Sequence, residues 1–146
     1  MEIKLYQAEQ EDMAWVNTQY EEIKFMPSEF ESEEIWIATA NGVKAGLGRL
    51  VHINEGNWEL GGIYVLDNFR GAGIARKIVQ KLCDIGQQKN ENIWCVPFNH
   101  LTSFYQSFGL NTYDPGMGNV PDDVLKKINY CESTYTQKVE LLKLKS

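Results

Sequence analysis

The chain has 146 residues, a formal net charge of −6 and 43% hydrophobic residues, which suits one packed domain over residues 1–146 and excludes wholesale disorder. The negative charge argues against nucleic-acid binding, which needs a basic surface. No apolar run reaches the roughly 18–20 residues of a membrane span, and the N-terminal segment lacks the profile of a secretory signal. We therefore expect a cytoplasmic protein that binds neither nucleic acid nor membrane.

The cysteine and histidine content bears on redox chemistry and metal binding. Cys83, Cys95 and Cys131 form no closely spaced pair, and three cysteines cannot all pair within one chain. Reduced thiols that pack in the core are the expected state. With two histidines and no CxxC motif, the sequence predicts no metal site.

The N-terminal quarter predicts a short strand, an amphipathic helix and an acidic segment. The helix is expected over about residues 8–24, because apolar residues recur there at intervals of three and four. Residues 28–34 then carry four glutamates in seven positions. A solvated acidic face explains them, and a field that attracts a cationic, amine-bearing substrate is the alternative. The apolar helix positions are Met13, Val16, Tyr20 and Ile23.

The rest of the chain alternates strand and helix patterns. Asn41-Gly42 predicts a tight hairpin turn, since both residues tolerate a positive φ. The expected elements are strands over residues 35–40, 43–53 and 58–65, a helix over 73–88, a strand over 92–98, a helix over about 100–108, a short helix after Pro121 and a strand over 134–144. This order predicts an α+β (α/β/α-like) fold with a mixed, mostly antiparallel sheet and helices on both faces.

A glycine-containing turn joins the third of these strands to the helix that follows. A strand that passes through Gly71 and Gly73 into a helix leaves unpaired N–H groups at the positive end of the helix dipole. Arg70 and Arg76 add positive charge, so the turn predicts a phosphate site. The sequence lacks GxxxxGK[ST], and its GxGxxG pattern fails at Arg76, so neither a P-loop nor a dinucleotide fold is expected.

The same turn carries a family resemblance. Arg70-Gly71-Ala72-Gly73-Ile74-Ala75 matches the [Q/R]xxGx[G/A] signature of the GNAT superfamily of N-acetyltransferases. The later segment FYQSFGL resembles the second signature of that family, a helix that ends in tyrosine before a glycine-apolar pair. The order and spacing agree over nearly the whole chain and best over residues 59–110. The resemblance implies a single GNAT domain whose sheet is splayed at the cofactor site.

The resemblance also implies how acetyl-CoA is held. Backbone N–H groups of the turn would hold its pyrophosphate, and the preceding strand would hydrogen-bond the pantetheine arm, which behaves rather like an added strand. Asn99 is displaced by one position from the asparagine of many relatives, so capping of the following helix is its alternative role. The expected cofactor-binding residues are Ile63, Tyr64, Val65, Arg70, Gly71, Ala72, Gly73, Ile74, Ala75, Arg76 and Asn99.

Three residues are candidates for moving protons. Tyr105 stands where many family members place the tyrosine that protonates the leaving sulfur, and packing as a core aromatic is the alternative. Glu59 lies eleven residues before Arg70, the offset of the glutamate base in the histone acetyltransferases of the family. His52 lies across from Glu59 if the second hairpin turn holds two or four residues, whereas a three-residue turn breaks that register. A surface charge pair is the alternative for both.

The leading hypothesis is an N-acetyltransferase that moves the acetyl group of acetyl-CoA directly to a small-molecule or peptide amine, with no metal. Residues 15–30 and 111–121 would form the acceptor pocket, and the acidic segment favours a cationic acceptor. A non-catalytic acyl-CoA sensor of the same fold is the alternative, because fold does not establish activity. A nucleotide-binding protein is a third reading. Both a monomer and a homodimer fit the sequence.

Overall fold

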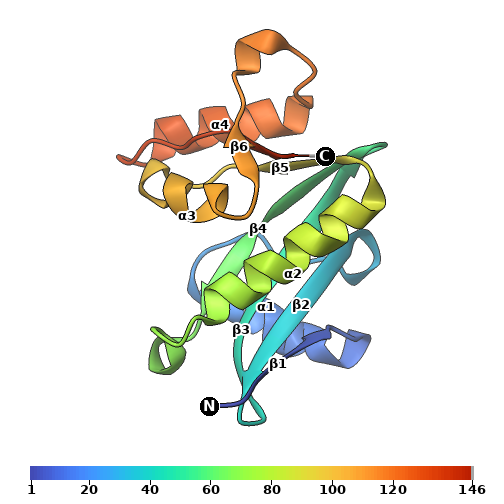
Figure 1. Ribbon diagram of the computed structural model, residues 1–146, viewed down its shortest axis with the longest axis vertical. Coiled ribbons are helices and arrows are strands. Elements are labelled where there is room, and N and C mark those ends of the chain that lie inside the picture. The colour runs from blue at the N-terminus through green and yellow to red at the C-terminus, as the bar shows by residue number, and fades with distance from the viewer. Residues whose placement is uncertain (146) are drawn as a thin grey trace. The chain divides into compact units, whose positions relative to one another are not determined.

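The computed structural model describes residues 1–145 of the chain (Figure 1). Its strands and helices are β1 (Ile3–Gln7), α1 (Met13–Glu22), β2 (Glu33–Ala40), β3 (Val43–Asn54), β4 (Asn57–Val65), α2 (Ile74–Lys89), β5 (Asn92–Cys95), α3 (Thr102–Gln106), β6 (Leu110–Thr112), α4 (Asp122–Thr134) and β7 (Leu142–Leu144). Hydrogen bonding orders the strands β1-β2-β3-β4-β5-β7-β6. Strands β4 and β5 run parallel, whereas the β1–β2, β2–β3, β5–β7 and β6–β7 pairs are antiparallel. The predicted α+β fold with a mixed, mostly antiparallel sheet is confirmed.

Contacts divide the chain into two compact units. The first unit contains Met1–Val51 and Gly62–Leu82, and the second contains His52–Gly61 and Cys83–Ser146.

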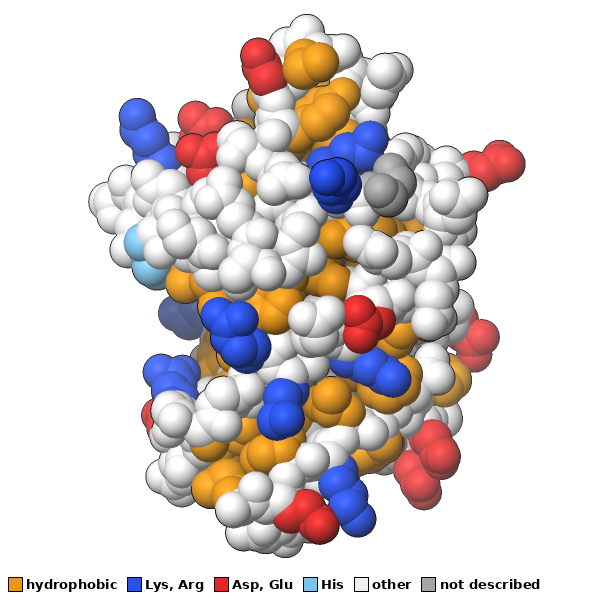
Figure 2. Space-filling view, viewed as in Figure 1, with side chains coloured by type: hydrophobic (Ala, Val, Ile, Leu, Met, Phe, Trp, Pro, Cys, Tyr) orange, Lys and Arg blue, Asp and Glu red, His pale blue; other side chains and the backbone are white. Residues whose placement is uncertain are grey.

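Among the described residues, no helix is long and apolar enough to cross a bilayer. On the face that Figure 2 shows, Lys and Arg side chains stand as separate groups among apolar and uncharged surface.

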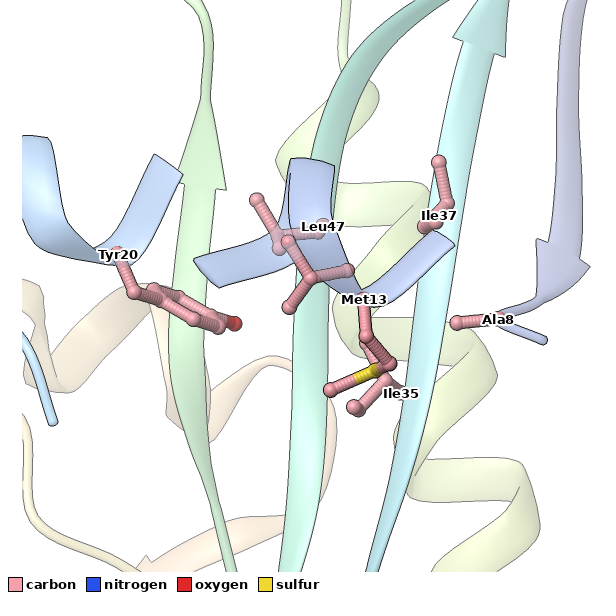
Figure 3. Packing of buried hydrophobic residues seen from close by; sticks show 7 residues of the cluster. Ala8, Met13, Tyr20, Ile35, Ile37 and Leu47 are labelled. Atoms are coloured by element: carbon pink, nitrogen blue, oxygen red, sulfur yellow. The ribbon is translucent and has the colours of Figure 1, made fainter. Parts of the chain in front are cut away.

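In the first unit, helices cover opposite faces of the strands. The α1 residues Met13, Val16 and Tyr20 pack with Ile35 and Leu47 of the sheet in one buried cluster (Figure 3). Helix α2 packs on the other face, where the strand carries glycines. A Cβ atom on Gly46 would lie 3.2 Å from Ile78, and one on Gly48 would lie 2.7 Å from the same side chain. The glycines therefore let α2 approach the strand backbone closely, and the prediction of helices on both faces is confirmed.

In the second unit, α4 covers one face of β5 through a cluster built on Trp94, Val124 and Leu141. The C-terminal part of α2 lies against the opposite face. There a Cβ atom on Gly86 would lie 2.9 Å from Ile93. Because neighbouring strand residues point to opposite faces, Ile93 packs against α2 and Trp94 packs against α4.

The three cysteines are free and buried, as the sequence predicted. Burial raises the pKa of the Cys83 thiol to about 12 and also raises that of Cys95. Burial raises the pKa of Cys131 as well, although Lys127 opposes the shift. All three thiols therefore stay protonated near neutral pH and act as packing groups.

The first hairpin turn agrees with its prediction. Asn41 and Gly42 both have positive φ values, 51° and 83°, and Ala40 pairs directly with Val43. Two consecutive residues with positive φ are the requirement of a type I′ turn.

The C-terminal third departs most from the predictions. The strand expected over residues 134–144 is only β7, with one isolated bridge between Phe98 and Val139. Helix α4 instead extends to Thr134, and the short strand β6 was expected to be loop. Strand β5 ends at Cys95 rather than at residue 98. Pro97 has no N–H to donate to a ladder, which explains the early end.

Candidate active site

The turn between β4 and α2 has the geometry of an anion site. Gly71 and Gly73 have φ values of 87° and 76°, and α2 begins at Ile74. A Cβ atom at either glycine would meet nothing within 4 Å, so the backbone conformation, rather than lack of space, favours glycine here. Gly71, Ala72 and Gly73 are exposed. The first N–H groups of the 16-residue helix have no acceptor within the helix and lie at its positive end, next to this exposed turn.

The side chain of Arg70 folds back onto the end of β4. Its Nε donates a hydrogen bond to the carbonyl oxygen of Val65 at 3.2 Å, and its guanidinium lies 3.2 Å from the Asp67 carboxylate. The same group lies 6.0 Å from the ring centroid of Tyr64. Arg70 therefore ties the turn to the strand, and its side chain remains largely exposed, at 61%.

Strand β4 separates from β5 partway along its length. The two strands pair from Asn57 to Leu60 on β4, although β4 continues to Val65. Within residues 1–145, the pairing with β5 gives no partner to residues 61–65. Gly62 in this segment has a φ of 62°. The splayed sheet that the family resemblance implied is thus present, and it leaves a β4 edge free for main-chain hydrogen bonds.

A buried polar cluster supports the backbone at Gly62. The Tyr20 hydroxyl donates a hydrogen bond to the Gly62 carbonyl oxygen at 2.7 Å. The Arg49 guanidinium lies 4.2 Å from the centroid of the Tyr20 ring and donates to the Ser28 hydroxyl at 2.5 Å. It also lies 3.7 Å from a carboxylate oxygen of Glu33.

The sequence pattern predicts only a position on the apolar face of α1 for Tyr20 and does not reveal this role. Burial raises the pKa of the Tyr20 phenol, so it remains a donor at neutral pH. A Cβ atom on Gly62 would lie 2.6 Å from the Tyr20 oxygen and 2.9 Å from Nε of Arg49. No side chain fits at position 62 without displacing this cluster.

Tyr105 lies on α3 and is 7% exposed. Burial raises the pKa of its phenol, and nearby Cys95 and Cys83 act in the same direction. The phenol therefore holds its proton at neutral pH, which a general acid requires. Its ring also packs against Phe104 at a centroid distance of 5.1 Å, so the residue is part of the local apolar packing as well.

Glu59 lies on β4 opposite Trp94 of β5, and its carboxylate is paired with the ammonium group of Lys127 on α4. The Glu59 side chain is 16% exposed, against 43% for Lys127. A Cβ atom on Gly61 would lie 3.7 Å from a Glu59 carboxylate oxygen, so the carboxylate lies beside the next residue of the same strand face. No sequence pattern indicates Lys127, because residues on α4 and β4 meet only through the tertiary fold.

The expected neighbourhood of His52 and Glu59 is corrected by the structure. The His52 ring lies 4.8 Å from the Trp58 ring, edge to face. Trp58 and Glu59 are consecutive on a strand, so they point to opposite faces, and Trp58 is the one that faces His52.

Asn99 is exposed and is the first residue of a short 3-10 turn, Asn99–Leu101. Its N–H donates to the carbonyl oxygen of Lys138 at 2.8 Å. Its side chain caps neither that turn nor α3, so the capping alternative is not what the structure shows. A role in holding the cofactor remains a prediction.

The fold and this site define a class of protein. It is an α+β domain in which a turn suited to anions leads into a helix and follows a strand with an unpaired edge. The family model for the acetyltransferase (GNAT) family matches residues 3–110, and the chain belongs to that family. The predicted family and its acetyltransferase class are thereby confirmed. No curated protein matches the chain.

Solved structures agree with this fold at low sequence identity. An acetyltransferase of the GNAT family from Elizabethkingia anophelis, with acetyl-CoA bound, is 16% identical, with a TM-score of 0.67 over 99% of this chain and 98% of that one. The ribosomal-protein-S18-alanine N-acetyltransferase from Escherichia coli is 14% identical, with a TM-score of 0.70 over 98% and 93%. N-acetylglutamate synthase from Neisseria gonorrhoeae, complexed with coenzyme A and N-acetyl-glutamate, is 14% identical, with a TM-score of 0.69 over 100% and 36%.

Proposed function

We propose that this protein transfers the acetyl group of acetyl-CoA directly to the amine of a small molecule or peptide. The observation that carries the proposal is the exposed glycine turn at the start of α2, at the end of a strand whose edge is unpaired from Gly61 to Val65. Family membership supports acetyl-CoA as the donor. The similar protein from Elizabethkingia anophelis was solved with acetyl-CoA bound, which adds support.

The donor would be held mainly by backbone groups. N–H groups of Gly71 to Ala75 suit a pyrophosphate, because they combine unpaired donors with the positive end of a helix dipole. Main-chain groups of Ile63 and Val65 suit the amides of a pantetheine arm, since an extended chain can join a free strand edge. When bound, acetyl-CoA supplies a thioester carbonyl that an amine can attack.

Proton transfer would fall to side chains. Glu59 is a carboxylate that already accepts a hydrogen bond from an ammonium group, so it is suited to receive a proton from an acceptor amine, directly or through water. Tyr105 keeps its proton at neutral pH and would give it to the departing thiolate. His52 is not placed to share this task through Glu59, because its ring faces Trp58.

The acceptor is proposed only as a class. Residues 15–30 and 111–121 each expose a large apolar side chain, Met26 at 78% and Met117 at 73%. Such side chains suit contacts with the body of an organic acceptor. The similar structures include enzymes named for a protein alanine and for glutamate, so this fold accommodates acceptors of different size.

The test is release of free thiol from acetyl-CoA in the presence of a panel of amines, polyamines, amino acids and short peptides. Wild type is compared with Tyr105→Phe and Glu59→Gln, and acetyl-CoA binding is measured in all three by calorimetry. The proposal expects amine-dependent release that falls in both variants while binding persists. Tight binding without release across the panel would instead support the acyl-CoA sensor. If wild type does not bind acetyl-CoA, the assignment of the glycine turn as the donor-binding site is wrong.

A further inference from the structure

Lys127 presents a primary amine to the residue proposed as the catalytic base. Its Nζ donates a hydrogen bond to the carboxylate of Glu59, and the two groups form an ion pair. An acceptor amine must reach the active site as an ammonium ion and give up a proton before it can attack. The contact between Lys127 and Glu59 is the contact that such an acceptor would make.

The place of this ion pair in the sheet adds to the argument. The carboxylate lies beside Gly61, at 3.7 Å from the position that a Cβ atom would take there. Pairing between β4 and β5 ends at Leu60 and Cys95, one residue before Gly61. The ammonium group of Lys127 therefore stands where the strands part and the free β4 edge begins.

Lys127 differs in this respect from its neighbour in sequence. Lys126 also lies on α4 and is exposed, and its side chain points away by about 100° around the helix axis. The two lysines share sequence context and helix position, but only Lys127 is paired with Glu59 among the ion pairs of the described chain. Lys126 is therefore a matched internal control for reactions at Lys127.

We propose that Lys127 fills the ammonium position of the acceptor and is a self-acetylation site of this enzyme. The inference rests on the proposed function. In the reaction Glu59 takes a proton from Nζ, and the neutral nitrogen bonds to the acetyl carbon as the carbon–sulfur bond breaks. The thiolate leaves with the Tyr105 proton as coenzyme A, and the second proton lost from the nitrogen returns to the Tyr105 oxygen through water. The product is a neutral amide at Lys127 that no longer pairs with Glu59.

The experiment incubates the purified protein with acetyl-CoA and follows acetylation at Lys127 and Lys126 by peptide mass spectrometry over time. We expect the initial rate at Lys127 to exceed that at Lys126 by at least about tenfold, because a held amine reacts faster than a free one. The fraction modified per unit time should not depend on protein concentration, since the reaction is intramolecular. Glu59→Gln and Tyr105→Phe should bring Lys127 down to the rate of Lys126.

Equal rates at the two lysines in wild type would overturn the inference, as would a Lys127 rate that rises in proportion to protein concentration. A separate experiment measures the acetylation of the two lysines by acetic anhydride, without acetyl-CoA. There Lys127 should react more slowly than Lys126 in wild type, because its nitrogen is engaged in the contact with the Glu59 carboxylate, and as fast as Lys126 in Glu59→Gln. Equal labelling in wild type would show that the ion pair is absent in solution and would also overturn the inference.

These outcomes separate the inference from the proposed function. Turnover of external amines without preferential modification of Lys127 would remove only the self-acetylation site. Loss of both turnover and modification, with the anhydride protection of Lys127 intact, would remove the proposed function and, with it, the inference.

Discussion

The two units of the chain differ in what builds them. In the first unit, the Asn41-Gly42 turn and the glycine turn before α2 follow from local residue choice, and both lie where the sequence placed them. In the second unit, β6 and β7 have three residues each and depend on pairing between distant segments, because β7 pairs with both β5 and β6. The proposed donor-binding turn belongs to the first unit, and Glu59 and Tyr105 belong to the second. A donor-binding turn made of backbone groups can thus be predicted from the sequence. The partners of the side chains proposed to move protons cannot.

The largest stability effect should come from Gly62→Ala, which tests whether the strand edge depends on the Tyr20 cluster. The new Cβ atom would lie 2.6 Å from the Tyr20 oxygen on a backbone with a φ of 62°. We expect a loss of at least about 2 kcal/mol in unfolding free energy, measured with urea, from strain and displacement together. Gly42→Ala is the control, since Gly42 has a φ of 83° and open space. Equal losses in the two variants would show that crowding at Gly62 contributes nothing.

The largest catalytic effect should come from Tyr105→Phe, which removes the proposed acid and leaves the ring. The ring packing against Phe104 is retained, so we expect kcat to fall by about 10²-fold or more with little change in thermal midpoint. Thiol-release kinetics with a saturating amine measure this. A kcat within a factor of about two of wild type would reduce Tyr105 to a packing residue.

An intermediate effect is expected from Tyr20→Phe, which removes the hydrogen bond to the Gly62 carbonyl oxygen. The loss should cost about 1 kcal/mol of stability. Since the hydroxyl supports the free strand edge, the KM for acetyl-CoA should rise more than kcat falls. Tyr130→Phe is the matched control, because Tyr130 is 59% exposed on α4. If both variants leave the KM unchanged, the Tyr20 cluster does not position the edge.

The smallest effect is expected from Arg70→Ala. The side chain is 61% exposed, and its ion pair with Asp67 is on the surface, so stability should change by less than about 0.5 kcal/mol. Because backbone N–H groups are proposed to hold the pyrophosphate, the KM for acetyl-CoA should rise only a few-fold. A loss of binding by orders of magnitude would transfer the main role from the backbone to the Arg70 side chain.

The sequence supplied the fold and the outline of the site, because they depend on periodicity, turn residues and signature spacing. It placed α2 within one residue of its bounds at each end, since Ile74, Ile78 and Leu82 repeat at helical intervals. It failed where distant residues decide the outcome. The pairing of Lys127 with Glu59 joins residues 68 positions apart, and the packing of His52 against Trp58 depends on how two strands meet.

The most direct test of the account is acetyl-CoA affinity, measured by calorimetry in the double variant Glu59→Gln/Tyr105→Phe and in Gly73→Ala. If backbone groups of the glycine turn hold the donor and the two side chains only move protons, the double variant should bind within about twofold of wild type. Gly73→Ala should bind more weakly, because its φ of 76° disfavours a side chain that has open space around it. Weak binding by the double variant together with unchanged binding by Gly73→Ala would contradict the division between donor binding and proton transfer.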